Sequence, residues 1–385
     1  MSEQLIDISD IKLPKGLRKI PFYLEPKFFE FSYALFEACN LRCTFCFEGH
    51  RNNKVDIPAL YEVPQHIFQN LKEDLKKYSS IKDINLRFWG GELFYDALSD
   101  EVFDAYKFIV DECRKLINKE YPDINLRFSW LTNGVWTKWE RVKELLDYSN
   151  GVLGFSYDPD GRFLIEAHKE QMINNVLRFN KMGFTTNLSI TLTKKTIEKY
   201  VNNESDINRF PKHIKFDVNY YTANPKWESL ICEDDDLFNF FKWALEEGHF
   251  NINVVENLLA AGTGNEIYFK GHYCDCKTCK QFSNGYCTVD CAKRASILPR
   301  SMFYGKYTDE IDEENVSEAK LAIGYEKMGC LYCEYNNLCQ MPCWITVVFQ
   351  GYKPTNCPFK RIYEYIKKNP HIEQNYLKWR ELYGN

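Results

Sequence analysis

The sequence of 385 residues contains no long apolar run and no excess of basic residues. No apolar stretch approaches the roughly 18 residues that a membrane-spanning helix needs, so no membrane partner is expected. The first ten residues are polar and acidic, which is not typical of a secretory signal. The net charge is −5, whereas a nucleic-acid-binding surface would be basic. These absences predict a cytoplasmic protein that binds neither membranes nor nucleic acid.

Cysteine, in contrast, is abundant, with 15 in the chain. In a chain without an export signal, such a content indicates metal binding rather than disulfides. The length allows about two to three domains, or one large barrel with an appendage. Hydrophobic residues make up 45% of the chain, which is enough for a sizeable core.

Short apolar runs alternate with amphipathic stretches from Phe29 to about Thr222. The runs predict strands and the stretches predict helices. This order favours an α/β fold in which helices cover a parallel sheet, and six units fit a partial barrel better than a complete eightfold one. The expected strands are Phe31–Phe36, Ile84–Phe88, Leu126–Leu131, Val152–Ser156, Thr186–Leu192 and Phe216–Tyr220. The expected helices are Gln65–Tyr78, Glu101–Leu116, Trp139–Tyr148 and Leu164–Met182.

The alternation ends before the last third of the chain. One helix is expected at Asp235–Glu247 and a helical end at Pro358–Tyr383, but the sequence between them is aperiodic and rich in cysteine. Loops that bury little apolar surface need metal to order them. The expected parts are an N-terminal extension (1–28), a barrel (29–226) and a cysteine-rich domain (227–385).

Three cysteines follow the first expected strand at C-x3-C-x2-C spacing: Cys39, Cys43 and Cys46. A [4Fe–4S] cluster normally takes four thiolates, so three leave one iron without a protein ligand. An open metal position is where chemistry occurs, as at catalytic zinc sites. The alternative is a zinc knuckle, but zinc prefers four nitrogen or sulfur ligands and only His50 is placed to complete the set.

With Phe45 before its third cysteine, this triplet resembles the cluster motif of the radical S-adenosylmethionine (radical SAM) enzymes. In that family the open iron binds the methionine end of SAM. The reduced cluster then cleaves SAM to a 5′-deoxyadenosyl radical, which abstracts a hydrogen atom from the substrate. The family core is a (β/α)6 partial barrel, in agreement with the alternation of strands and helices.

Two segments after later strands extend the resemblance. Gly90-Gly91-Glu92 follows the second strand and resembles the family segment that contacts the amino group of SAM. Paired glycines allow a backbone to approach a ligand closely. Asn133 lies in a Thr-Asn-Gly segment after the third strand, which is also similar to the family pattern.

The fourth and fifth strands supply weaker signals. Ser156 begins a Ser-x-Asp segment similar to the one that meets the SAM ribose, although Pro159 replaces the glycine that often follows. Ser189 on the fifth strand and Asn219 on the sixth either point into the barrel or belong to ordinary strand ends. Ser189 is included among the expected cofactor contacts.

The C-terminal cysteines resemble the SPASM domain, an extension of certain radical SAM enzymes that holds two auxiliary [4Fe–4S] clusters. A zinc ribbon is the alternative for these pairs. The resemblance assigns to the outer cluster Cys330, Cys333, Cys339 and Cys357, and to the inner cluster Cys343 with Cys274, Cys279 and Cys291. Cys276 and Cys287 remain alternatives for the inner cluster, and Cys113 and Cys232 are expected to be small core residues.

SPASM-bearing enzymes mostly act on peptides or proteins, forming crosslinks or thioethers, epimerising residues or oxidising side chains. The resemblance therefore implies a peptide-modifying oxidoreductase with SAM, three [4Fe–4S] clusters and a flavodoxin- or ferredoxin-like electron donor. A small-molecule dehydrogenase and a non-enzymatic metal-binding module are the alternatives.

Three residues are candidates for the chemistry on the substrate. Asp158 and Asp290 are possible bases, and Tyr157 is a candidate hydrogen donor. Only 38 residues precede Cys39, so either a separate peptide-recognition protein recruits the substrate or the barrel binds it directly.

Overall fold

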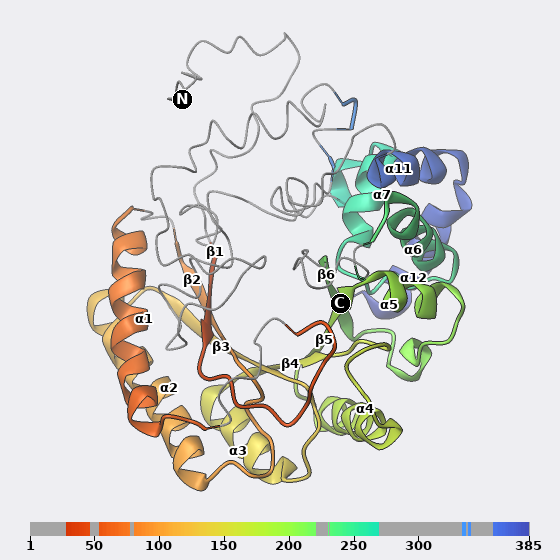
Figure 1. The fold of residues 1–385 in the computed structure, drawn as a ribbon. Coiled ribbons are helices and arrows are strands. Elements are labelled where there is room, and N and C mark those ends of the chain that lie inside the picture. Colours follow the sequence, from red (N-terminus) through yellow and green to blue (C-terminus); the bar gives the residue numbers. More distant parts are fainter. Residues whose placement is uncertain are drawn as a thin grey trace, which may run out of the picture.

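The structure is a computed structural model that describes residues 28–46, 54–77, 81–220, 230, 232–268, 333–335, 338–339 and 357–384. Six parallel strands form one sheet in the order β1-β2-β3-β4-β5-β6, curved into a half-barrel with helices outside (Figure 1). The strands are β1 (Phe28–Ala34), β2 (Asp83–Trp89), β3 (Asn125–Thr132), β4 (Val152–Ser156), β5 (Thr186–Leu192) and β6 (Lys215–Tyr220). The sequence therefore predicted the α/β partial barrel correctly.

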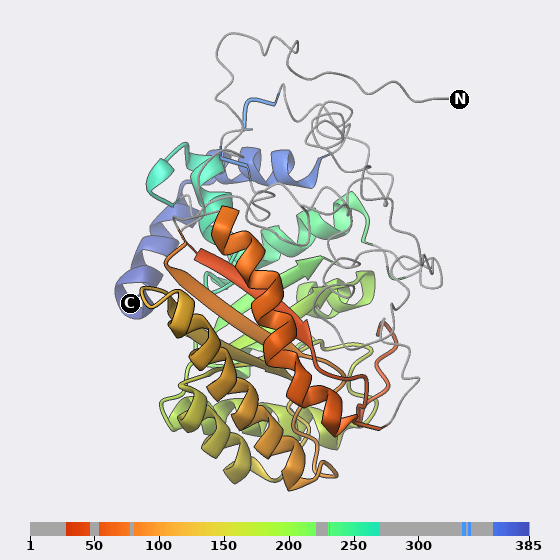
Figure 2. The same ribbon diagram turned by 90° about the vertical axis from the view of Figure 1, so that its left-hand side faces the viewer.

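Each strand is followed by helical structure that covers the outer face of the sheet, as parallel pairing requires. Figure 2 shows α1 and α2 lying side by side over the first strands. The covering helices are α1 (Ile57–Lys77), α2 (Asp100–Glu120), α3 (Trp139–Ser149), α4 (Glu166–Lys181) and α5 (Lys194–Val201), with a short 3₁₀ helix η2 (Ile207–Arg209) before β6.

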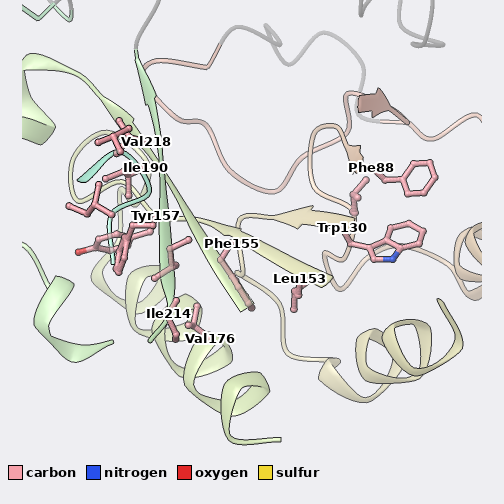
Figure 3. Packing of buried hydrophobic residues seen from close by; sticks show 14 of the residues in the cluster. Phe88, Trp130, Leu153, Phe155, Tyr157, Val176, Ile190, Ile214 and Val218 are labelled. Atoms are coloured by element: carbon pink, nitrogen blue, oxygen red, sulfur yellow. The ribbon is translucent and has the colours of Figure 1, made fainter. Parts of the chain in front are cut away.

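The main core lies between the strands and these helices. Phe88, Trp130, Leu153 and Phe155 project from β2, β3 and β4 toward the helices and are fully buried (Figure 3). Side chains alternate across a strand, so their neighbours face the inside of the half-barrel, where most of them are partly exposed. The strands thus bury one side and leave the other available for a ligand.

A second group of helices packs beside β6 (Figure 1). They are α6 (Asp234–Glu246), α7 (Val255–Thr263), α11 (Pro358–Lys368) and α12 (His371–Tyr383), with a 3₁₀ helix η4 (Glu266–Tyr268) after α7. A side chain at Gly262 would meet Ile366 at 2.6 Å, so α7 and α11 approach closely only because this position is glycine. The C-terminal helices therefore extend the barrel core.

Element boundaries differ from the expectations in a few places. Helix α1 begins eight residues earlier than expected and continues through Pro64. The expected C-terminal helix is divided at Asn369 and Pro370, because proline cannot donate the backbone hydrogen bond that a continuous helix needs. Helices α5 and α7 were not predicted. Among the helices of the described residues, none is both long and apolar enough to cross a membrane.

His249 supplies a test of the packing beside β6. Its buried ring stacks on Trp243, with 4.5 Å between ring centroids, and Lys212 Nζ lies 3.5 Å from its Nδ1. Burial, and to a smaller extent the charge of Lys212, lowers the pKa of His249 to about 4. The folded protein therefore holds this imidazole neutral at pH values where the unfolded chain protonates it.

We expect His249 to weaken the fold as pH falls from about 6.5 toward 4, because the unfolded chain takes up the proton first. The loss in the free energy of unfolding approaches about 3 kcal/mol, because the pKa of the imidazole differs by roughly two to three between the folded and the unfolded protein. Urea unfolding of the wild type and of His249→Phe, which keeps the ring stacking, measures it. The variant should lose less stability over this range; equal losses would contradict the account.

Candidate active site

Cys39, Cys43 and Cys46 lie on the loop that follows β1, and their thiols are partly exposed. The Leu41 N–H donates to Cys39 Sγ at 3.4 Å, and the Cys46 N–H donates to the Cys43 carbonyl at 3.2 Å. These turns gather the three cysteines at the carboxyl end of the barrel, where parallel α/β folds place their active sites.

The donor set fits a [4Fe–4S] cluster with one open iron, because one loop carries three thiols. In a cubane cluster each thiolate binds a different iron, so three thiolates leave the fourth iron without a protein ligand. The ligands of a single zinc ion share one tetrahedron, which would need a fourth donor here. His50, the one candidate fourth zinc ligand, lies outside the described residues.

Burial favours the neutral thiols in the absence of metal. It raises the pKa of Cys39 to about 11 and raises the pKa of Cys43 as well. Thiolates are the form that binds metal, so cluster binding must displace these protons. Hydrogen-bond donors directed at the sulfur atoms stabilise the thiolate form and orient it.

Gly90 and Gly91 lie against the backbone that leads into the cysteine loop. The Gly91 N–H donates to the Phe36 carbonyl at 2.7 Å. A Cβ at Gly91 would lie 2.1 Å from the Ala38 carbonyl oxygen, and one at Gly90 would lie 2.5 Å from that of Phe36. Both positions therefore require glycine to let two backbone segments touch, whatever ligand they also contact.

Glu92 connects the loop after β2 to the loop after β3. Its buried carboxylate accepts hydrogen bonds from the Phe94 N–H at 3.0 Å, the Thr132 hydroxyl at 2.5 Å and the Asn133 N–H at 2.5 Å. Burial raises the pKa of Glu92 to about 7, although these donors act in the opposite direction. The expected SAM-binding glutamate is thus already held in place by the chain itself.

Asn133 connects the loop after β3 to the cysteine loop. Its Nδ2 donates to Asn40 Oδ1 at 2.8 Å and lies 3.9 Å from Cys39 Sγ. Asn40 in turn donates from its Nδ2 to the Val135 carbonyl at 2.7 Å. The Thr-Asn-Gly segment therefore braces the first cysteine.

The loop after β4 contacts the cysteine loop at Cys43 and Thr44. Asp158 is fully buried and accepts hydrogen bonds from Arg162 Nε at 2.5 Å and from the Thr191 N–H at 2.6 Å. Arg162 Nη1 also donates to Cys43 Sγ at 3.7 Å. A role for Arg162 was not predicted from the sequence. The only sequence feature that could have indicated one is its position four residues after Asp158, a spacing that allows an ion pair.

Other predicted residues occupy more varied places. Ser156 lies on the inner face at the end of β4, and Ser189 accepts a hydrogen bond from Asn219 Nδ2 at 2.5 Å on the same face. Phe45 lies beside Arg162, with 5.3 Å between the guanidinium carbon and the ring centroid. Tyr157 faces the helices (Figure 3), and its hydroxyl accepts from the Asp206 N–H at 2.9 Å. The structure does not bring Tyr157 to the cysteine loop.

The C-terminal cysteines are described only in part. Cys357 lies at the start of α11; burial raises its pKa, and Cys333 is close enough to contribute to the shift. The Tyr363 hydroxyl donates to Cys339 Sγ at 3.2 Å. Cys113 and Cys232 are buried in the core, as predicted. Outside the described residues lie Asp290 and the cysteines 274, 276, 279, 287, 291, 330 and 343.

Comparison with known families agrees with this site. Residues 33–202 match the Radical SAM superfamily, and this range contains β1 to β5 with all three loop cysteines. This segment of the chain therefore matches a radical SAM domain, and the superfamily implies SAM and a [4Fe–4S] cluster. A search among curated proteins finds no matching relative.

Solved structures with the same fold cover nearly the whole chain. A structure of anSMEcpe with bound AdoMet and Cp18Cys peptide has a TM-score of 0.56 and 16% identity, covering 92% of this chain and 99% of that one. A second anSMEcpe structure, with bound AdoMet and Kp18Cys peptide, has a TM-score of 0.57 and 15% identity over 92% and 100% of the two chains. At these identities the similarity establishes the fold.

Replacing Gly91 tests the backbone contact that holds the cysteine loop. We expect Gly91→Ala to lower the free energy of unfolding by about 1–3 kcal/mol, because the added methyl overlaps two carbonyl oxygens. Urea unfolding of the apoprotein measures this loss. The matched control is Gly154→Ala, whose methyl would have its nearest neighbour at 3.5 Å, an ordinary contact. Equal stabilities for the two variants would show that the contact does not constrain the loop.

Proposed function

We propose that this radical SAM protein oxidatively modifies a peptide or protein substrate. The observation that carries the proposal is the three-cysteine loop, braced by the loops after β2, β3 and β4 at the carboxyl end of the half-barrel. When bound there, the cluster and SAM supply a 5′-deoxyadenosyl radical, as in the superfamily. The chain's own residues hold both groups beside the inner face of the sheet.

In this proposal Cys39, Cys43 and Cys46 hold the cluster through three irons. The proposed cofactor contacts come from the cysteine loop, the loops after β2 and β3, and strands β4 and β5: Phe45, Gly90, Gly91, Glu92, Asn133, Ser156 and Ser189. Glu92 and Asn133 do not need to rearrange to serve, because hydrogen bonds within the chain already fix their positions. Such preorganisation avoids an ordering cost when the cofactor binds.

The inner face of the half-barrel is polar, which supports a substrate with many hydrogen-bonding groups. Arg87 Nη1 pairs with Glu30 Oε1 at 2.9 Å, and Asn85 donates from its Nδ2 to Glu30 Oε2 at 2.9 Å. Asp217 on β6 also interacts with the charge of Arg87. Closed eightfold barrels fill this space with branched apolar side chains. A peptide suits a polar inner face, and the anSMEcpe structures with bound peptides support the same substrate class.

Asp158, a candidate base in the sequence, holds Arg162 and the end of β5 in the structure. It remains a candidate base by position, but both of its carboxylate oxygens already accept hydrogen bonds. Asp290 remains a candidate base from the sequence alone. We propose further that a flavodoxin- or ferredoxin-like protein supplies the electron, and that a separate recognition protein or the barrel itself selects the substrate.

The C-terminal cysteines are proposed to hold two auxiliary [4Fe–4S] clusters. Anaerobic reconstitution followed by iron and sulfide analysis tests this number. We expect about 12 irons per chain, falling to about 8 in a variant with Cys39, Cys43 and Cys46 all replaced by alanine. A wild-type content near 4 irons, with zinc elsewhere, would contradict the auxiliary clusters and leave the radical SAM cluster intact.

The substrate class is tested by following hydrogen transfer. With reduced protein and SAM, we expect a deuterated substrate peptide to transfer deuterium to 5′-deoxyadenosine and to lose mass through oxidation. The probes are deuterated cysteine- and serine-containing peptides, with deuterated amino sugars as the small-molecule comparison. Transfer only from the amino sugars would favour the small-molecule dehydrogenase over the peptide-modifying enzyme.

A further inference from the structure

The loop after β4 contacts the cysteine loop through its backbone at Gly161 and through the side chain of Arg162. The Thr44 N–H donates to the Gly161 carbonyl at 2.8 Å, joining the two backbones. Gly161 has φ of +77°, and a Cβ there would lie 2.4 Å from Thr44 Oγ1. The contact therefore needs glycine both for its backbone conformation and for its closeness. Arg162, the next residue, is carried directly against the cysteines.

Arg162 is held there by a buried anion. Its Nε donates to Asp158 Oδ2 at 2.5 Å, and only 14% of its side chain is exposed. Asp158 is fully buried, and its other oxygen accepts from the Thr191 N–H at 2.6 Å, which ties it to the end of β5. A guanidinium presents several donors in a fixed plane, so pairing at Nε leaves the Nη groups available.

The free end of this guanidinium is directed at the cluster site. Arg162 Nη1 donates to Cys43 Sγ at 3.7 Å, and the guanidinium carbon lies 5.3 Å from the centre of the Phe45 ring. The backbone bond between Thr44 and Gly161 already joins the loops, so this charge is not needed merely to hold them together. The guanidinium is mostly buried and contacts Cys43 Sγ directly, so its charge can act on the thiolate form of this ligand.

Hydrogen bonds to the sulfur atoms and nearby charge set the potential of an iron–sulfur cluster. Reduction adds one electron and therefore one negative charge, which a neighbouring cation stabilises in a partly buried site. We propose that Arg162, positioned by Asp158, raises the reduction potential of the cluster on Cys39, Cys43 and Cys46. The inference rests on the proposed function because it requires the cluster to be bound.

A redox titration followed by electron paramagnetic resonance tests this inference without SAM or substrate. The relevant signal is the one missing from the protein with all three loop cysteines replaced by alanine. In Arg162→Gln we expect the ratio of reduced to oxidised cluster at a fixed potential to fall about tenfold, a shift of about 59 mV for one electron. Arg162→Lys, which keeps the positive charge, should shift less.

Arg178→Gln is the matched control. Arg178 is also a partly buried arginine; it lies on α4 over the Trp139 ring and donates to Asn175 at 3.2 Å. Its replacement should leave the cluster potential unchanged. If Arg162→Gln fails to take up the cluster, Arg162→Met, which keeps the apolar stem, replaces it with the same expected shift. Iron content and visible absorption establish that each variant is loaded.

A loaded Arg162 variant with the wild-type potential would overturn the inference. If that variant also binds SAM more weakly, Arg162 is a cofactor contact instead. Failure of the proposed function gives different results. Without a cluster on the cysteine loop, the wild type itself would show no reducible signal that depends on the three cysteines, and with a different substrate class only the deuterium-transfer experiment would change.

Discussion

The site depends on the close approach of two backbone segments at the carboxyl end of the barrel. Residues 36–38, which lead from β1 to the first cysteine, lie against Gly90 and Gly91 at distances that no side chain permits. Hydrogen bonds from Gly91 and Glu92 to Phe36 and Ala38 continue the strand pairing beyond the sheet. The backbone that leads into the cysteine loop is therefore tied to the segment after β2 by the chain's own hydrogen bonds.

Two buried carboxylates, Glu92 and Asp158, connect the other loops of the site. Glu92 joins the second loop to the third, and Asp158 joins the fourth loop to the end of β5 and to Arg162. Each is supplied with donors that offset the cost of burying a charged or polar group. Together with Asn133, they hold four loops as one unit around the cysteines, which is how an enzyme keeps reactive groups in a fixed geometry.

The sequence revealed the six strands because their apolar runs are short, regular and separated by helices. It also revealed the cysteine loop and the Gly-Gly-Glu segment, since both depend on residues that are close in the chain. The sequence did not predict why glycine is needed at positions 90 and 91, where the chain's own backbone from another loop lies against them. Arg162 was not predicted either, because its contact is with Cys43, more than a hundred residues earlier in the chain.

Tyr157 shows where stricter use of strand periodicity would have helped. Ser156 lies on the inner face of β4, so the alternation of side chains directs Tyr157 toward the helices, where the structure places it. The C-terminal cysteine pattern carries a specific resemblance, but only Cys333, Cys339 and Cys357 of its predicted ligands lie within the described residues. Spacing alone does not assign the remaining cysteines, because several compete for the same cluster.

The central claim is that the three-cysteine loop presents a cluster with one open iron to SAM. The most direct measurement is cleavage of SAM by the reconstituted, chemically reduced protein, followed as the release of 5′-deoxyadenosine and methionine. The account predicts that the wild type forms both products and that Cys43→Ala, loaded at its other metal sites, forms neither. Intact SAM after incubation with a fully loaded and reduced wild-type protein would contradict it.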